Sequence, residues 1–119
     1  MKIFTSKVRS AGDLAGVFEY DGETGYFYLY DQWRKPGKKV LDAIQILSTA
    51  ADFEERDVQV LWNSNETCVG LVIRDQVWAA FDTRTQAKYG GDYRRNAVSP
   101  VLEEIVKAFD PSMIRRNGQ

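Results

Sequence analysis

The feature that most limits the fold is a series of three short apolar runs separated by tight polar links. The runs cover residues 58–62, 68–73 and 77–81, which are lengths typical of β-strands. Links as short as 63–67 and 74–76 join antiparallel neighbours, so the pattern predicts a three-stranded meander. The run at 68–73 is apolar at nearly every position, which predicts that both of its faces are covered.

A second strand signal comes earlier in the chain. Residues 14–20 and 26–30 are rich in aromatic and β-branched side chains, which favour strands. Asp21-Gly22-Glu23-Thr24-Gly25 lies between them, and its glycines supply the positive φ angles that a short hairpin turn needs. The pattern predicts a β-hairpin.

Two segments have helical spacing. In residues 40–47 the apolar positions share one helical face, namely Val40, Leu41, Ile44 and Leu47; the last residues of this segment could instead be extended. Residues 99–109 begin with Ser99, a helix-capping residue, and Pro100, which suits a first helical position. The face expected to be buried there contains Val98, Val101, Leu102, Ile105, Val106 and Phe109.

Together these patterns predict one domain over residues 1–119. Its class is α+β: an about five-stranded, largely antiparallel sheet, made of the hairpin and the meander, with one short central helix and one C-terminal helix. Residues 111–119 are expected to form a frayed tail. Two helices are few for covering both faces of five strands, so we expect loops, a second copy or a partner to cover one face.

Catalytic chemistry has few candidates in this chain. There is no histidine and only one cysteine, Cys68, so neither a histidine-based catalytic triad nor a Cys/His zinc site can be assembled. Cys68 lies in an apolar run and is expected to be a buried thiol. Asp82 and Asp75, at the ends of a predicted strand, are the remaining acid/base candidates. We expect no enzyme activity, no metal and no cofactor.

The charge balance also constrains partners. With 16 basic and 17 acidic residues the net charge is −1, which gives no global field for attracting nucleic acid or anionic lipid and permits self-association. The longest uncharged apolar run is about six residues, far below the ~20 needed to span a bilayer, and the N-terminus lacks a signal-peptide pattern. We expect a cytoplasmic protein without membrane contact.

Two groups of residues are candidates for interaction. Tyr26, Tyr28 and Tyr30 alternate and therefore share one sheet face, where they could stack on bases, anchor a protein interface or simply pack the sheet. The polar connection 83–97 is long for a small domain. It carries a Gly-Gly pair and six basic or aromatic candidates: Arg84, Lys88, Tyr89, Tyr93, Arg94 and Arg95.

The central third of the chain resembles a family of small uncharacterised bacterial proteins. The resemblance rests on Leu61-Trp62-Asn63, on Val69-Gly70-Leu71-Val72-Ile73 and on Val77-Trp78-Ala79-Ala80-Phe81-Asp82, a meander pattern that recurs in that family. It implies a bacterial origin and an α+β fold. Because the family has no assigned activity, the resemblance implies no functional residue.

The hypothesis that these observations favour is a protein-interaction module of unknown partner, for example a small bacterial regulatory or immunity-type protein or a homodimer. It predicts that replacing Tyr93 or Arg94 by Ala leaves folding intact and weakens a complex. A nucleic-acid or nucleotide-phosphate binder, which would use Arg84, Lys88, Arg94 and Arg95 with the tyrosine face, and a carboxylate-based enzyme stay open as alternatives.

Overall fold

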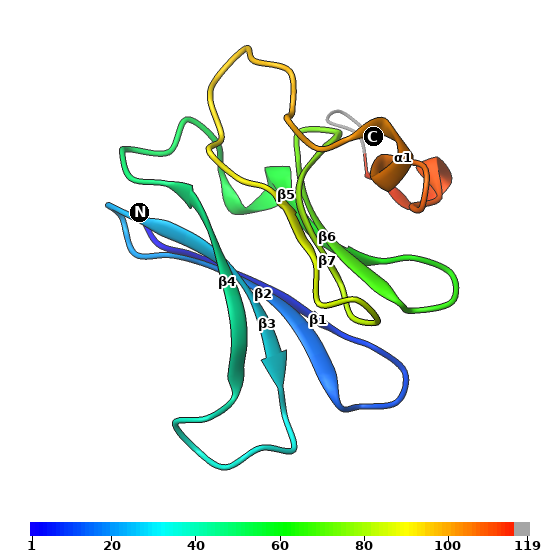
Figure 1. Ribbon diagram of the computed structural model, residues 1–119. Coiled ribbons are helices and arrows are strands. Elements are labelled where there is room, and N and C mark those ends of the chain that lie inside the picture. Colours follow the sequence, from blue (N-terminus) through cyan, green and yellow to red (C-terminus); the bar gives the residue numbers. More distant parts are fainter. Residues whose placement is uncertain (116–119) are drawn as a thin grey trace.

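The computed structural model, which describes residues 1–115, is a sandwich of two antiparallel sheets (Figure 1). The N-terminal sheet contains β1 (Ile3–Val8), β2 (Leu14–Tyr20), β3 (Gly25–Asp31) and β4 (Val40–Leu47), and the C-terminal sheet contains β5 (Val58–Trp62), β6 (Cys68–Ile73), β7 (Gln76–Asp82) and β8 (Lys88–Gly90). Both sheets are meanders, with their strands in chain order. The fold is therefore mainly β, rather than a single five-stranded sheet with two helices.

Five of the eight strands within residues 1–115 lie where the sequence predicts them. The β2–β3 turn forms as expected: Gly22 has φ 103°, and the Asp21 carboxylate accepts hydrogen bonds from the backbone N–H groups of Glu23 and Thr24, both at 2.8 Å. The sequence did not predict β1 or β8. The middle of β1 is polar, and β8 has only three residues, so neither carries a strand-length apolar pattern.

The predicted helix at 40–47 is wrong, because this segment is strand β4. Its pairing with β3 has two irregularities, where Tyr30 pairs with Val40 but Leu29 with Asp42, and where Tyr26 pairs with Gln45 but Gly25 with Leu47. Each irregularity inserts one extra residue into β4, as in a β-bulge. The bulges shift the strand alternation twice, and the shifted apolar positions imitate helical spacing.

The core lies between the inner faces of the two sheets. Phe27 of β3 stacks on Phe81 of β7, with ring centroids 5.3 Å apart. Gly16 of β2 allows the sheets to approach, because a Cβ atom there would lie 2.6 Å from Cγ2 of Val69 on β6 and thus far inside contact distance. The two sheets approach closely at this point, and a glycine in the strand is required there.

One edge of the sandwich is closed by the chain that leaves β8. The backbone N–H groups of Asp92 and Tyr93 donate to the carbonyls of Gln45 and Ile46 on β4, at 3.2 and 2.7 Å. At the opposite edge the indole N–H of Trp62 on β5 donates to the Lys7 carbonyl on β1, at 2.9 Å. The predicted unstructured connection 83–97 is thus in part a strand and in part a link between the sheets.

The predicted C-terminal helix is also largely wrong. Only α1 (Glu103–Val106) is helical, and Ser99 donates a hydrogen bond to the Val77 carbonyl of β7 instead of capping a helix. Val98, expected to be buried, is 88% exposed, whereas Val101 and Phe109 are buried. The segment buries side chains one at a time against the sheet beneath it, rather than as a single helical stripe.

Residues 98–115, called the cover below, lie across the outer face of the C-terminal sheet (Figure 1). They include α1 and a short 3₁₀ turn, η2 (Pro111–Met113); a second such turn, η1 (Glu55–Asp57), precedes β5. The Arg115 guanidinium donates to the Val58 carbonyl of β5 at 2.8 Å. Residues 111–115 are therefore attached to the sheet, and the rest of the predicted frayed tail, 116–119, lies outside the described residues.

Candidate functional site

The tyrosine row of β3 points away from the core. Tyr26, Tyr28 and Tyr30 pair with Glu19, Val17 and Ala15 of β2, while the alternating residues of both strands face the C-terminal sheet. The three tyrosines share one sheet face, as the sequence predicts. The strand register shows that this face is the outer one.

The pairing of all four strands extends each tyrosine into a cross-strand row of outward-pointing residues. We call these twelve residues the open face. Its first row contains Phe4, Glu19, Tyr26 and Gln45, its second Ser6, Val17, Tyr28 and Ala43, and its third Val8, Ala15, Tyr30 and Val40. Phe4 and Val40 are 58% and 52% exposed. Of the twelve, Glu19 is the one that carries a charge.

The open face is shallowly hollowed rather than flat. A depression of about 440 Å³ extends over it, lined chiefly by outward residues of β1, β2 and β3 with Gln32 and Val40. Tyr26 and Tyr28 stack with ring centroids 5.9 Å apart, and the Lys39 ammonium lies over the Tyr30 ring, 5.9 Å from its centroid. Burial, with the neighbouring Glu19 carboxylate, raises the pKa of Tyr28 above its ordinary value.

In the connection 83–97, the candidate residue Tyr93 packs against internal side chains. Tyr93 lies edge-on to Phe53 and Trp78, at 5.0 and 4.9 Å between ring centroids, and its hydroxyl donates to Asp52 Oδ1 at 2.8 Å. Burial, followed by this hydrogen bond, raises the pKa of Tyr93 to about 12. Because Tyr93 holds an internal network together, replacing it by Ala is expected to cost stability as well as any interaction.

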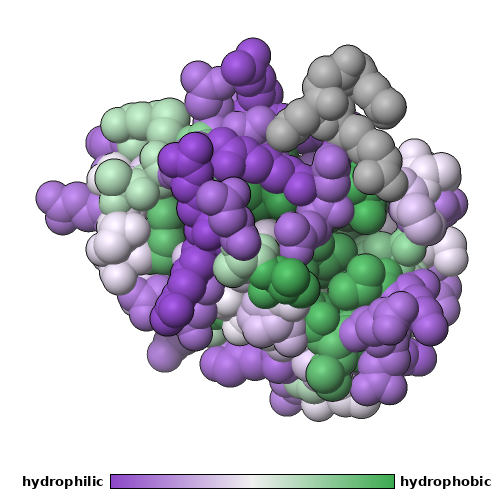
Figure 2. Space-filling model, turned by 90° about the horizontal axis from the view of Figure 1, so that it is seen from above, coloured by the Kyte–Doolittle hydropathy of each residue, from purple (hydrophilic) through white to green (hydrophobic). Residues whose placement is uncertain are grey.

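Most of the basic candidates in this connection have carboxylate partners. Arg84 pairs with Asp82 at 3.3 Å, Lys88 with Asp42 at 3.1 Å, and Arg95 with Asp52 at 3.5 Å. Two other candidates are placed differently: Arg94 is exposed, and Tyr89 packs in the cluster under the cover. The end of the molecule over which residues 91–97 run presents mostly hydrophilic atoms toward the viewer, with hydrophobic residues gathered to one side (Figure 2). The tyrosine row and the basic residues do not form one surface.

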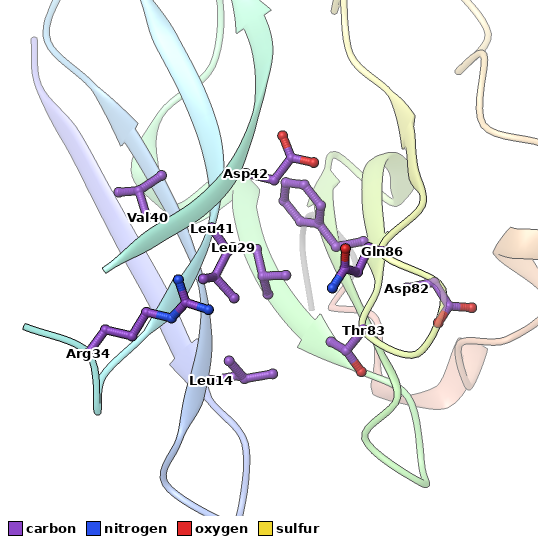
Figure 3. A pocket seen from close by; sticks show the side chains of 10 residues that line it. Leu14, Leu29, Arg34, Val40, Leu41, Asp42, Asp82, Thr83 and Gln86 are labelled. Carbon is purple, nitrogen blue, oxygen red and sulfur yellow. The ribbon is translucent and has the colours of Figure 1, made fainter. Parts of the chain in front are cut away.

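A cleft of about 320 Å³ opens between the two sheets, at the end where β3 leads into the loop before β4. Leu14, Leu29 and Leu41 line it from the N-terminal sheet, and Thr83 and Gln86 line it from the β7–β8 turn, while Arg34 reaches in from the loop (Figure 3). The charged residues of its lining have ion-pair partners: Arg34 pairs with Asp31 at 3.4 Å, and Asp42 and Asp82 pair with Lys88 and Arg84.

Asp82, a candidate acid or base, stabilises the turn that follows β7. Asp82 accepts hydrogen bonds from the backbone N–H groups of Arg84 and Thr85, at 2.9 and 3.3 Å, and points away from the leucines of the cleft (Figure 3). Burial opposes its ionisation, but these bonds and the Arg84 guanidinium hold the pKa of Asp82 below its ordinary value. Asp75 lies in the β6–β7 turn with φ 74°. The Asp82 carboxyl group therefore lacks the raised pKa that suits a general acid at neutral pH.

Cys68 is buried, as the sequence predicts. Burial raises the pKa of its thiol, which opposes the reactive thiolate form. Within residues 1–115, no three Asp, Glu, Cys or His side chains gather closely enough to hold a metal ion, and no helix there is long and apolar enough to cross a membrane.

Sequence reasoning missed most of the open face. It identified the tyrosines but not Phe4, Val8, Val17 or Val40. The hairpin pairing could have suggested Val17, since strand alternation sets it beside Tyr28. No sequence pattern indicates which residues of β1 and β4 lie on the open face, because β1 is polar in its middle and β4 has two bulges.

The comparisons with known proteins give a family without an assigned activity. A family model described as an uncharacterised protein conserved in bacteria (DUF2251) matches residues 1–104, a range that includes all of the strands found within residues 1–115. An uncharacterised protein of Haemophilus influenzae is 34% identical over an alignment of 71 residues, with coverage of 57% of this chain and 44% of that protein. The chain therefore spans less than half the length of this relative. No solved structure matches the chain.

Proposed function

The chain belongs to this bacterial family, and we propose that it is a protein-interaction module that binds its partner on the open face. The observation that carries the proposal is a contrast between the two outer surfaces of the sandwich. The cover buries the apolar outer face of the C-terminal sheet. On the open face the Lys39 side chain lies over Tyr30, but no described helix or strand packs against this face (Figure 1). An apolar surface without a cover inside the chain is the usual mark of an interaction site.

The composition of the open face supports a protein partner. An antiparallel sheet with one solvated face normally alternates apolar residues inward and polar residues outward. Here the outward residues of β3 are all tyrosines, and those of β1, β2 and β4 include Phe4, Val8, Val17 and Val40. Tyrosine and phenylalanine are enriched in the cores of protein interfaces, and charged residues are depleted there.

The two alternatives receive less support. A nucleic-acid binder would use Arg84, Lys88, Arg94 and Arg95 for phosphate contacts, but three of these four, all except the exposed Arg94, already lie within 3.5 Å of a carboxylate oxygen. An enzyme would need a proton-transferring group in the cleft, where the Asp82 carboxylate instead organises a turn. Both functions stay predictions, testable by oligonucleotide binding at low salt and by substrate screening.

The proposal extends to the setting in which the protein acts. We place it in the cytoplasm, where a lone thiol such as Cys68 stays reduced, and a role as a small regulatory or immunity-type protein is compatible with an exposed apolar face. Tyr28, at the centre of the face, is expected to contribute most to binding, since energetic hot spots lie near the middle of an interface.

A photo-crosslinking amino acid at position 17 tests the proposal in bacterial cells. Val17 points outward in the middle row, so we expect covalent adducts that mass spectrometry can assign to a protein partner. The matched control carries the same amino acid in place of Glu103, whose side chain on the cover is 85% exposed, and is expected to give few adducts. A position-17 protein that gives no more adducts than the control would contradict the proposal.

A further inference from the structure

We infer that the occupant of the open face is a second copy of this chain, in a face-to-face dimer with a two-fold axis along the middle row of the face. The inference rests on the proposed function and names its partner. The axis would run across the strands through Ser6, Val17, Tyr28 and Ala43, so that the first row of each copy faces the third row of the other. Closed two-fold pairing of identical surfaces is the commonest form of protein oligomer.

The distribution of charge along the face supports this arrangement. Glu19 lies at one end of the face, in the row of Tyr26, and the Lys39 ammonium lies at the other end, over Tyr30. A two-fold axis across the strands reverses the strand direction between the copies. Each Glu19 then faces the row of Tyr30 in the second copy, offset sideways by about one strand spacing of ~4.8 Å from the Tyr30 over which the Lys39 ammonium lies. Two opposite-charge pairs form, one at each end.

The other face-to-face arrangement is electrostatically unfavourable. A two-fold axis parallel to the strands, between β2 and β3, would set each first row against the same row of the second copy. The two Glu19 residues would then be offset sideways by only about one strand spacing, and the two Lys39 residues would be similarly offset. Like charges brought together in an interface weaken it and suppress that geometry, so the charges select the axis across the strands.

The size of the face indicates a weak dimer. Four strands spaced about 4.8 Å apart, with three rows about 6.6 Å apart along them, give the face a projected area of about 380 Å². Two such faces bury on the order of 800 Å² before side-chain relief is added, which is in the range of weak, transient interfaces. The net charge of −1 adds little repulsion between copies. We therefore expect a dimer that forms and dissociates with concentration.

Sedimentation equilibrium of the full chain from about 1 μM to 1 mM tests the inference. The average mass is expected to rise from that of the 13.6 kDa chain toward twice that value across this range. Charge reversal then tests the geometry. Glu19→Lys and Lys39→Glu are each expected to weaken dimerisation about fivefold to tenfold, since each variant sets two like-charge pairs in the interface. The double variant, with both charges exchanged, is expected to recover most of the loss.

A control exchanges charges on the other surface. Glu103 and Lys107 form an exposed pair on the cover, 4.0 Å apart, so Glu103→Lys and Lys107→Glu are expected to leave dimerisation unchanged. Thermal unfolding of each variant shows whether it is folded. If the single reversals weaken the dimer but the double variant does not recover, or if none of them has an effect, the arrangement is overturned.

The combined results of sedimentation and crosslinking separate this inference from the proposed function. A chain that is monomeric at every concentration, yet gives adducts with a different protein at position 17, overturns the dimer and leaves the interaction module in place. A monomeric chain without adducts at position 17 overturns both. Adducts only between copies of this chain, together with recovery in the double variant, support both.

Discussion

The two outer surfaces of the sandwich are built alike but differ in whether the chain covers them. Both belong to four-stranded antiparallel meanders, and both present apolar side chains away from the core. On the C-terminal sheet the cover lays Val101 and Phe109 onto these side chains. On the N-terminal sheet Phe4, Val8 and Val40 stay exposed, and the tyrosine row is half-buried. An apolar face is thus part of the fold's own stability where the chain covers it, and a place for a partner where it does not.

The largest effect is expected where the cover meets the sheet. Phe109 is 2% exposed, and Phe109→Ala is expected to lower the free energy of unfolding by about 3 kcal/mol, through lost burial and the cavity left behind. Urea unfolding monitored by circular dichroism measures this loss. A loss below about 1 kcal/mol, in the range of ordinary surface substitutions, would show that the cover contributes little and would remove the contrast between the faces.

Gly70 of β6 lies beneath the Phe109 ring and tests the same contact between the cover and the sheet. A Cβ atom at this position would lie 2.9 Å from Cζ of the Phe109 ring, so Gly70→Ala is expected to cost about 2 kcal/mol by overpacking. The same substitution in a Phe109→Leu background is expected to cost clearly less, because the ring that it meets is gone. Equal costs in the two backgrounds would mean that the ring does not rest on Gly70.

Tyr93 tests the connection that leads from β8 to the cover. Tyr93→Phe keeps the aromatic packing and removes the hydrogen bond to Asp52, so we expect a loss of about 1 kcal/mol at neutral pH. Arg94→Ala, at an exposed position in the same connection, is the control and is expected to change stability little.

The pH dependence of Tyr93 has a defined sign. Its folded pKa is raised to about 12, above the value of about 10 for an unfolded tyrosine. The contribution is therefore complete below pH 10 and is lost as the pH rises toward 12, since the unfolded chain releases this proton first. Urea unfolding between pH 9 and 12 is expected to show a smaller fall for Tyr93→Phe than for the natural chain. Parallel falls would contradict this.

The smallest effect on stability is expected on the open face itself. Tyr28→Thr keeps a residue that favours strands and removes the central ring, so the isolated chain is expected to lose only about 0.5 kcal/mol. The same variant is expected to lose adducts from a crosslinker at position 17. A loss of stability as large as that of Phe109→Ala would show that the tyrosine row serves the fold rather than an interaction.

The sequence predicts only part of the contrast between the two faces. Tyr26, Tyr28 and Tyr30 were placed on one face by strand alternation, but the sequence could not say whether that face was inner or outer. The helical spacing of Val101, Ile105 and Phe109 predicts a helix in the cover. The same spacing also occurs when single side chains of an irregular segment are buried one at a time. The candidate residues of 83–97 were grouped by proximity in the chain, and folding sends most of them to separate partners.

What the sequence determined is local: strands wherever apolar and β-branched residues run continuously between turn residues, the β2–β3 turn through Asp21 and its glycines, and the absence of histidine chemistry. These depend on conformational preferences within a few residues. Only the tertiary structure decided that β4 is a bulged strand, that the sheets form two layers, and which outer face the chain covers. Those outcomes depend on pairing and packing between residues far apart in the chain, and short-range patterns do not encode them.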